Sequence, residues 1–249
     1  DGKDANVWTY DLSGTSPVKR LTFEGHNRYP LWSADGTHIV FQSDRGGDRG
    51  LWWQRADGSS VPERLTTAEA GAQHVPESWP ARGDRFSYGI VKDGRATLWT
   101  YVTSAKKAEP LGIETAGFVN SSFSPDGRWI AFDSDEFGRR EVYIGRTDSS
   151  DGATQVSVEG GRAAAWRADG KELFFLGGRR LMVVDVKADA KLLQFGTPKP
   201  LFELRLEGPQ RSRYQVAANG QKFLAVVPLE STRPASITVV TNWAAGIRK

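Results

Sequence analysis

The 249-residue chain contains no cysteine and a single methionine. The lack of cysteine excludes disulfide bonds, thiolate catalysis and cysteine-ligated zinc, although it does not indicate a cellular compartment. Long apolar runs are also lacking, so the sequence predicts no membrane span and no signal peptide. Because the chain begins at Asp1 and not at methionine, we expect a fragment of a longer protein or a mature product.

An excess of charge of one sign is also missing. The chain has 33 basic and 30 acidic residues, which gives a net charge of +3. Its adjacent basic residues, such as Lys19-Arg20 and Arg139-Arg140, are isolated pairs rather than a stripe that could follow a phosphate backbone. Solvated surface charge is the simpler interpretation. We therefore expect no nucleic-acid partner.

Glycine and aromatic residues are plentiful, with 27 Gly, 12 Phe, 9 Trp and 6 Tyr. This composition is typical of short strands joined by tight turns. The stretch FSPDGRWIAFDSD at 123–135 is one copy of a repeat that also occurs at 31–58, 78–103, 165–186 and, more weakly, 214–230. The copies are aligned on an aromatic or apolar anchor that recurs about every 43 to 50 residues. The anchors are Trp32, Trp79, Phe123, Trp166 and Val216.

Each repeat is predicted to form four strands. The first ends at the anchor, and an Asp-Gly turn follows, in which Asp bonds to its own turn and Gly takes the positive φ. Second strands are predicted at 37–42, 128–133 and 171–176, third strands at 50–55, 97–102, 141–146 and 181–186, and a short fourth strand at 63–66. Four short antiparallel strands at this period indicate an all-β protein, a β-propeller built from four-stranded blades.

The motif W/F-S-x-D-G-x-x-I-x-F-x-S-D resembles the WD40-like repeat known as PD40. That repeat occurs in the TolB propeller, in propellers of tricorn-type proteases and in C-terminal propellers of bacterial membrane-anchored Ser/Thr kinases. The segments 6–25 and 237–243 look most like the kinase-associated group. The resemblance implies an extracytoplasmic location, periplasmic or at the cell surface. It is specific for fold and says little about function.

We expect residues 1–249 to form a single propeller domain. The predicted strands at 7–12 and 18–22 resemble the outer half of a blade. If they belong to a separate blade whose inner strands lie upstream, the ring has six blades, one of them incomplete, which the resembled group also suggests. If they complete the blade that starts at Tyr214, the two termini close a five-bladed ring with one strand to spare.

A binding surface is expected at one mouth of the central channel, where propellers usually bind. The loop before each innermost strand, together with the first residues of that strand, reaches this mouth. The candidate ligand-binding residues are His26, Arg28, Tyr29, His74, Glu77, Asn120, Arg162, Arg213 and Tyr214. Arginine predominates, and it pairs bidentately with carboxylates, so an acidic ligand or a peptide terminus would suit the set. The simpler alternative is that these residues only line a water-filled channel.

These observations predict a non-catalytic interaction or sensing module, with no catalytic residues, no cofactor and no metal. The expected partner is a peptide, a protein segment or a small anionic molecule, and the segment itself does not insert into a membrane. The alternative is a channel-mouth lyase or hydrolase that uses His26, His74, Glu77 and Arg28, with the two histidines and the glutamate as possible metal ligands. No G-x-S-x-G motif marks a hydrolase. A structural propeller accessory to a protease is a third interpretation.

Overall fold

The computed structural model describes residues 5–136, 138–149, 152–188, 192–206, 214–227 and 237–241. The chain divides into two compact units, 1–119 and 120–249. The regular secondary structure of the described residues consists of strands, and no helix in this part of the chain is long and apolar enough to cross a membrane. The expectation of a single domain over 1–249 stays a prediction.

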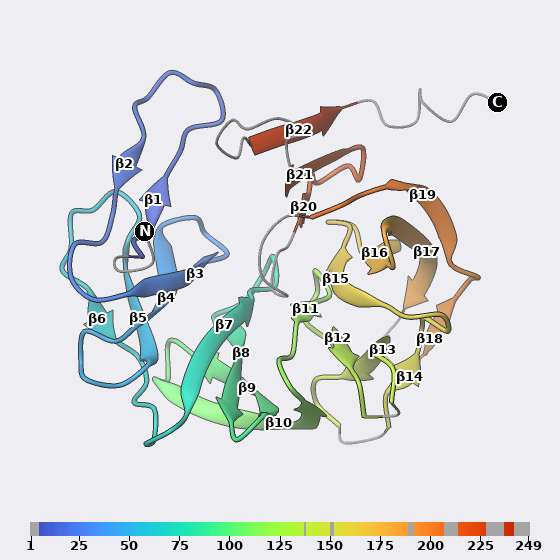
Figure 1. Cartoon of the computed structure of the whole chain (residues 1–249), viewed down its shortest axis with the longest axis horizontal. Coiled ribbons are helices and arrows are strands. Elements are labelled where there is room, and N and C mark those ends of the chain that lie inside the picture. The colour runs from blue at the N-terminus through green and yellow to red at the C-terminus, as the bar shows by residue number, and fades with distance from the viewer. Residues whose placement is uncertain are drawn as a thin grey trace. The chain divides into compact units, whose positions relative to one another are not determined.

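The described residues of the first unit form three antiparallel sheets (Figure 1). The first is a two-stranded ribbon of β1 (Trp8–Thr9) and β2 (Lys19–Arg20). The second has four strands, β3 (Asn27–Trp32), β4 (His38–Ser43), β5 (Gly50–Arg55) and β6 (Glu63–Arg64). The third also has four, β7 (Gln73–Ser78), β8 (Arg85–Lys92), β9 (Arg95–Val102) and β10 (Lys107–Ala116).

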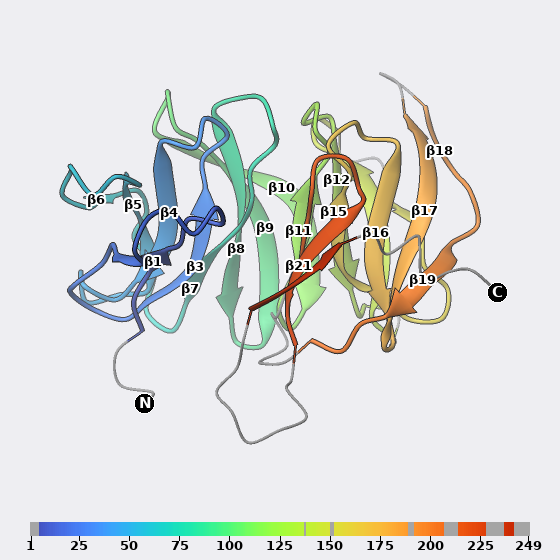
Figure 2. The same ribbon diagram turned by 90° about the horizontal axis from the view of Figure 1, so that it is seen from above.

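The described residues of the second unit also form three sheets, in which neighbouring strands follow one another in the chain except that β19 pairs with β17 (Figures 1 and 2). One sheet is β11 (Ser121–Phe123), β12 (Trp129–Ser134), β13 (Glu141–Arg146) and β14 (Thr154–Gln155). The next is β15 (Arg162–Trp166), β16 (Glu172–Gly177) and β17 (Arg180–Ala188), with β18 (Leu193–Phe195) and β19 (Lys199–Glu203) both pairing with β17. The last is β20 (Tyr214–Val216), β21 (Lys222–Val226) and β22 (Ile237–Thr241).

The repeated units predicted from the sequence are therefore confirmed as antiparallel sheets. The third strands at 50–55 and 141–146 have the predicted limits, whereas the second strands begin one residue later than predicted. This shift arises because the Ser-x-Asp-Gly turn extends one residue further. In the 121–155 sheet, the Ser124 hydroxyl donates to the Asp126 carboxylate at 2.6 Å, and that carboxylate accepts from the Arg128 N–H at 3.1 Å. Gly127 has a φ of 72°, which favours glycine.

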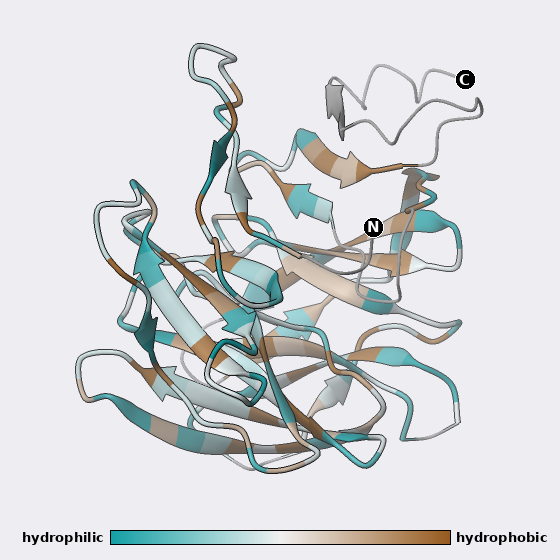
Figure 3. Cartoon of the chain, turned by 60° about the vertical axis from the view of Figure 1, so that its left-hand side comes forward, coloured by the Kyte–Doolittle hydropathy of each residue, from teal (hydrophilic) through white to brown (hydrophobic). Residues whose placement is uncertain are grey.

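The cores lie between neighbouring sheets, whose strands carry hydrophobic residues (brown in Figure 3). In the second unit, Trp129 and Ala131 of β12 pack in one buried cluster with Trp166, Leu173 and Phe175 of the next sheet. The sequence pattern predicts Trp129 on the opposite face from Ile130. All six residues of β12 are buried, and this cluster contains Trp129 and Ala131 but not Ile130. Each sheet thus contributes one apolar face to the core it shares with its neighbour.

A hydrogen bond that recurs in three sheets shows which strands of a blade β1 and β2 correspond to. In each case a hydroxyl that follows the fourth strand accepts the backbone N–H of a residue 15 positions earlier, at the start of the third strand. The three N–H and hydroxyl partners are Val7 with Thr22 at 2.9 Å, Leu51 with Thr66 at 3.0 Å and Val142 with Ser157 at 2.8 Å. By this register β1 and β2 correspond to the third and fourth strands of a blade.

The chain's two ends therefore contribute different parts of a blade. β1 and β2 are equivalent to an outer pair, as the sequence predicted, while β20, β21 and β22 follow one another as first, second and third strands. A single blade assembled from both ends would hold two third strands. The number of blades, six or five, stays a prediction.

Candidate ligand-binding surface

His26 lies in the segment before β3 and is held by Asp44, which follows β4. The Asp44 carboxylate accepts the His26 backbone N–H at 2.7 Å, and its other oxygen lies 2.8 Å from Nδ1 of the His26 ring. Desolvation opposes ionisation of Asp44, but the hydrogen bonds from His26 outweigh it and lower the pKa of that carboxyl. Both side chains are about two-fifths exposed. The ring is therefore oriented by a carboxylate and remains accessible to solvent.

Arg28 and Arg162 occupy the same place in two blades, four residues before the aromatic anchor. Each precedes a residue with positive φ, Tyr29 at 55° and Ala163 at 54°. At both places the strand pairing slips, between Arg28 and Leu31 in one sheet and between residues 162 and 165 in the other. A β-bulge of this kind re-aims a side chain, and non-glycine residues with positive φ cluster at functional sites.

Among the described residues, neither of these two guanidinium groups is held by a carboxylate. Across the described ranges, no salt bridge involves Arg28 or Arg162, whereas Arg55, Arg146 and Arg167 each pair with a nearby aspartate at 2.7 Å. Arg28 is exposed and Arg162 is half-buried. Two equivalent bulges therefore present arginines that can pair with an external anion.

His74 is buried in β7, only 6% exposed, and its side chain is therefore not accessible to a ligand. Its Nδ1 lies 2.7 Å from the Thr66 hydroxyl, and its backbone carbonyl accepts from the Gln42 side-chain amide at 2.7 Å. The ring also packs beside Tyr88, with centroids 5.4 Å apart. Burial lowers the pKa of His74 to about 4, because the charged imidazolium loses its hydration there.

The buried His74 makes stability depend on pH. Its folded-state pKa of about 4 lies below the ordinary value of 6.5, so the neutral ring is favoured in the folded state. The stabilisation is complete above about pH 6.5 and declines as the pH falls toward 4, by up to about 3 kcal/mol. We expect the free energy of unfolding, measured by urea titration, to fall in this window. His74→Gln should flatten this part of the profile, and an unchanged slope in that variant would assign it to other groups.

Glu77 is also buried, at 3% exposure on the same strand. In the described part of the chain, no three His, Asp or Glu side chains are grouped as a metal site would require. His26, His74 and Glu77 are all described, so the structure does not bring them together as the metal-binding alternative needs. The neighbouring acidic residues Asp133, Asp135 and Glu136, which are also described, do not form such a group either.

In the second unit, Asn120 joins a buried polar cluster around Asp133. Asp133 is fully buried and accepts three hydrogen bonds, from the Asn120 N–H at 2.9 Å, the Asn120 amide at 2.8 Å and the Ala163 N–H at 3.1 Å. Its Oδ1 also lies 3.6 Å from Nη1 of Arg140. Burial raises the pKa of Asp133, with Arg140 and the hydrogen bonds acting in the opposite direction.

Tyr214, at the start of β20, is 3% exposed and packs near Phe223, with ring centroids 6.3 Å apart. Burial raises the pKa of its hydroxyl well above the usual value. Tyr214 is therefore part of a core in this structure. The remaining candidate, Arg213, lies outside the described residues.

One repeated contact between neighbouring sheets was not predicted from the sequence. It is made by the residue just before Ser-Asp in the motif. Gln42 and Asp133 occupy this position, and each reaches the first strand of the following sheet. Gln42 donates to the carbonyl of His74, whereas Asp133 accepts from the N–H of Ala163. A buried polar residue within an otherwise apolar second strand is the signal that could have identified it.

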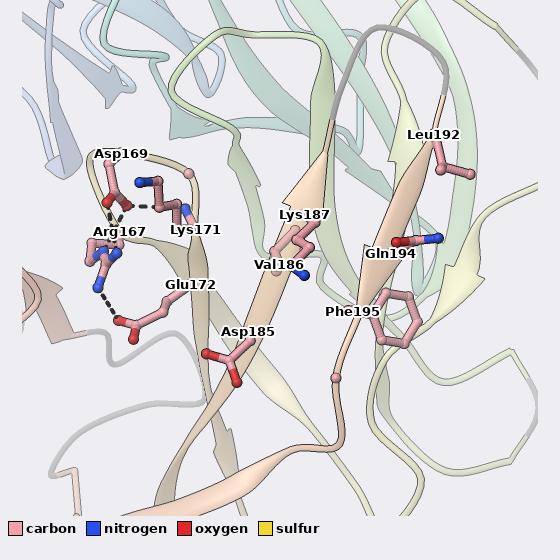
Figure 4. A pocket seen from close by; sticks show the side chains of 12 residues that line it. Arg167, Asp169, Lys171, Glu172, Asp185, Val186, Lys187, Leu192, Gln194 and Phe195 are labelled. Atoms are coloured by element: carbon pink, nitrogen blue, oxygen red, sulfur yellow. Dashed lines mark hydrogen bonds and ion pairs between the residues drawn. The ribbon is translucent and has the colours of Figure 1, made fainter.

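A cavity of about 1030 Å³ lies on the sheet that contains β16, β17 and β18 (Figure 4). Arg167 stands at one side, bonded to Asp169 at 2.7 Å and to Glu172 at 2.9 Å, while Phe195 and Gln194 come from β18. Because two carboxylates already bind the guanidinium of Arg167, it is less available to an external anion than the guanidinium groups of Arg28 and Arg162.

No family model matches the chain. Among curated proteins, it is 24% identical over 168 residues to the uncharacterized peptidase YuxL of Bacillus subtilis, which covers 53% of this chain and 25% of that protein. It is 36% identical over 66 residues to the uncharacterized protein Atu1656 of Agrobacterium fabrum, which covers 26% and 22% respectively. The aligned regions span about a quarter of the length of these relatives.

Solved structures define the fold class as a β-propeller. TolB from Acinetobacter baumannii matches with a TM-score of 0.74 at 16% identity, over 95% of this chain and 57% of that one. An oligogalacturonate lyase in complex with manganese matches at 0.66 and 12% identity, over 98% and 69%. A gluconolactonase from Xanthomonas campestris matches at 0.57 and 15% identity, over 88% and 75%. The chain thus has a TolB-like propeller fold, and at these identities the likeness shows fold alone.

Proposed function

We propose that this PD40-type propeller is a non-catalytic binding or sensing module that acts outside the cytoplasm. Its ligand is a peptide, a protein segment or a small anionic molecule, bound where the innermost strands begin. The shared fold with TolB is consistent with this role, but the lyase and the gluconolactonase show that the same fold also supports enzymes. The proposal therefore depends on the side chains of this chain.

The observation that carries the proposal is the pair of bulges that present Arg28 and Arg162. Two blades place a non-glycine residue with positive φ at the same position, directly after an arginine without a carboxylate partner among the described residues. A guanidinium pairs with a carboxylate through two parallel hydrogen bonds, which supports an acidic ligand or a peptide C-terminus.

The predicted residues divide into two groups by burial. His26, Arg28, Tyr29 and Arg162 are exposed or half-buried and are the ones that a ligand could reach. The others, which are almost fully buried, support the strands that carry the surface; these are His74, Glu77, Asn120 and Tyr214.

Binding to a free carboxylate tests the proposal. A panel of short peptides with free C-termini should raise the melting temperature, because a ligand that binds only the folded state stabilises it by mass action. The same peptides with amidated C-termini should have a weaker effect. For the best peptide, the alanine variant of the bulge that binds it, Arg28→Ala or Arg162→Ala, should weaken the Kd about tenfold or more, since a charged hydrogen bond contributes about 1.5–3 kcal/mol.

A matched control is Arg55→Ala, which removes an arginine that is already paired with Asp57 at 2.7 Å. This variant should bind like the wild-type chain. If amidated and free peptides bind equally, or if all three arginine variants lose affinity to the same extent, carboxylate recognition by the bulges is wrong.

A further inference from the structure

A pocket of about 420 Å³ lies in the first unit, between the sheet of β3–β6 and the sheet of β7–β10. Arg28 is at the start of β3, whereas this pocket adjoins the other end, since the turn that follows Trp32 lines it. Its volume is within the range of about 300–1,000 Å³ that is typical of small-molecule sites. Both sheets have four strands, and every lining residue is described. The lining includes Asp35, His38, Trp53, Trp79, Arg82 and Asp84.

Two half-buried tryptophans form aromatic walls of this pocket, and each is fixed by its own indole N–H. The N–H of Trp53 donates to the Glu63 carboxylate at 3.1 Å, and that of Trp79 donates to the carbonyl of Gly83 at 3.1 Å. Both rings pack against the same buried cluster, and the His38 ring stacks on Trp53 with centroids 4.4 Å apart. Because both N–H groups are engaged, a ligand would meet the carbon surface of the indoles.

The repeat itself does not require a tryptophan at position 53. Counted from the aromatic anchor through the strand pairing, the residues equivalent to Trp53 are Ile144 in β13 and Val183 in β17. Ile144 is 1% exposed and belongs to a core, so an aliphatic side chain satisfies the packing at this place of a blade. The indole of Trp53 therefore adds aromatic surface to the pocket beyond what the fold needs.

The polar groups at the rim of the pocket carry both signs of charge. The hydrogen bond from the Ser33 hydroxyl, with further bonds from Thr37, lowers the pKa of Asp35 to about 2. A hydrogen bond from Ser104 likewise lowers the pKa of Asp84, so both carboxylates are ionised acceptors at neutral pH. Arg82 is exposed and supplies donors. Either an anion or a cation would therefore meet a like charge here, whereas hydroxyl groups, which both donate and accept, suit the whole rim.

We propose that this pocket binds a saccharide of the β-glucose type, in which the ring hydroxyls are equatorial. Both faces of such a pyranose consist of C–H groups, so a face can lie on an indole while the hydroxyls project from its edge. Trp53 and Trp79 contact the C–H groups, and the hydroxyls bond to Asp35, Arg82 and Asp84 at the rim. This inference goes beyond the proposed function and does not depend on it, because the pocket and Arg28 lie at opposite ends of β3.

Titration of the whole chain with cellobiose, a disaccharide of two β-glucose-type rings, tests the proposal. We expect saturable binding by calorimetry, and saturation-transfer NMR should show the ring C–H protons of the sugar close to the protein. Sorbitol has similar hydroxyl groups but no ring face, so it should not bind. Trp53→Ile, which introduces the side chain found at the equivalent place in β13, should weaken the Kd for cellobiose about tenfold or more.

Two further variants decide between recognition in the pocket and an indirect effect. Arg82→Ala changes an exposed side chain and should weaken the Kd for cellobiose while leaving the urea midpoint unchanged. Trp8→Ala removes a tryptophan that is 55% exposed and does not line the pocket, so it should bind cellobiose like the wild-type chain. The proposal is overturned if cellobiose does not bind, if sorbitol binds equally well, or if Trp53→Ile and Trp8→Ala have the same affinity.

Discussion

Asp133→Asn is expected to lower the free energy of unfolding by about 3–5 kcal/mol, the effect of leaving buried charges and donors unpaired. The carboxylate accepts both the N–H and the side-chain amide of Asn120, accepts the N–H of Ala163 and faces Arg140. An asparagine has one acceptor oxygen, and its NH₂ group would point at one of these donors. The change is nearly isosteric, so packing cannot explain the loss.

Urea titration with a constant m-value measures this effect, because a shift of the midpoint alone reports stability. Asp148→Asn is the matched control. Asp148 also pairs with an arginine, Arg146 at 2.7 Å, but its side chain is 66% exposed, so the variant should lose less than about 1 kcal/mol. Similar losses in the two variants would contradict the view that Asp133 ties neighbouring sheets together.

The turns and strand order could be predicted because their causes are local. The residue types of Asp126-Gly127 and its equivalents are enough to predict a turn, since few residues other than glycine take a positive φ. Alternation of apolar residues then places the strands on either side. Five copies of the pattern reinforce one another, so the amino-acid sequence is sufficient to predict a propeller.

Burial and partners at the surface could not be predicted, because they depend on which strand faces which. His74 and Glu77 look like loop residues in the sequence, yet β7 begins at Gln73 and buries both. The pairing of His26 with Asp44 joins residues 18 positions apart across a sheet. The bulge at Arg28 could not be predicted from the sequence either, since tyrosine is not a residue type that favours a positive φ, as Tyr29 has here.

The two tryptophan anchors at equivalent positions are expected to respond very differently to truncation. Trp166→Ala should cost about 3–5 kcal/mol, because it empties a buried site shared with Trp129 and Leu173 and removes the hydrogen bond to Ser122. Trp32→Ala should cost about 1 kcal/mol or less, since half of that side chain is already in water. The two variants delete the same atoms from the same place in the repeat.

The difference in lost free energy of unfolding between the two variants therefore measures how much the neighbouring sheet contributes by covering the tryptophan. Denaturant unfolding of both variants in parallel gives the comparison. Each variant keeps the other anchor tryptophan, which serves as its internal reference. If Trp32→Ala proves as destabilising as Trp166→Ala, the side chain of Trp32 is covered in solution as Trp166 is.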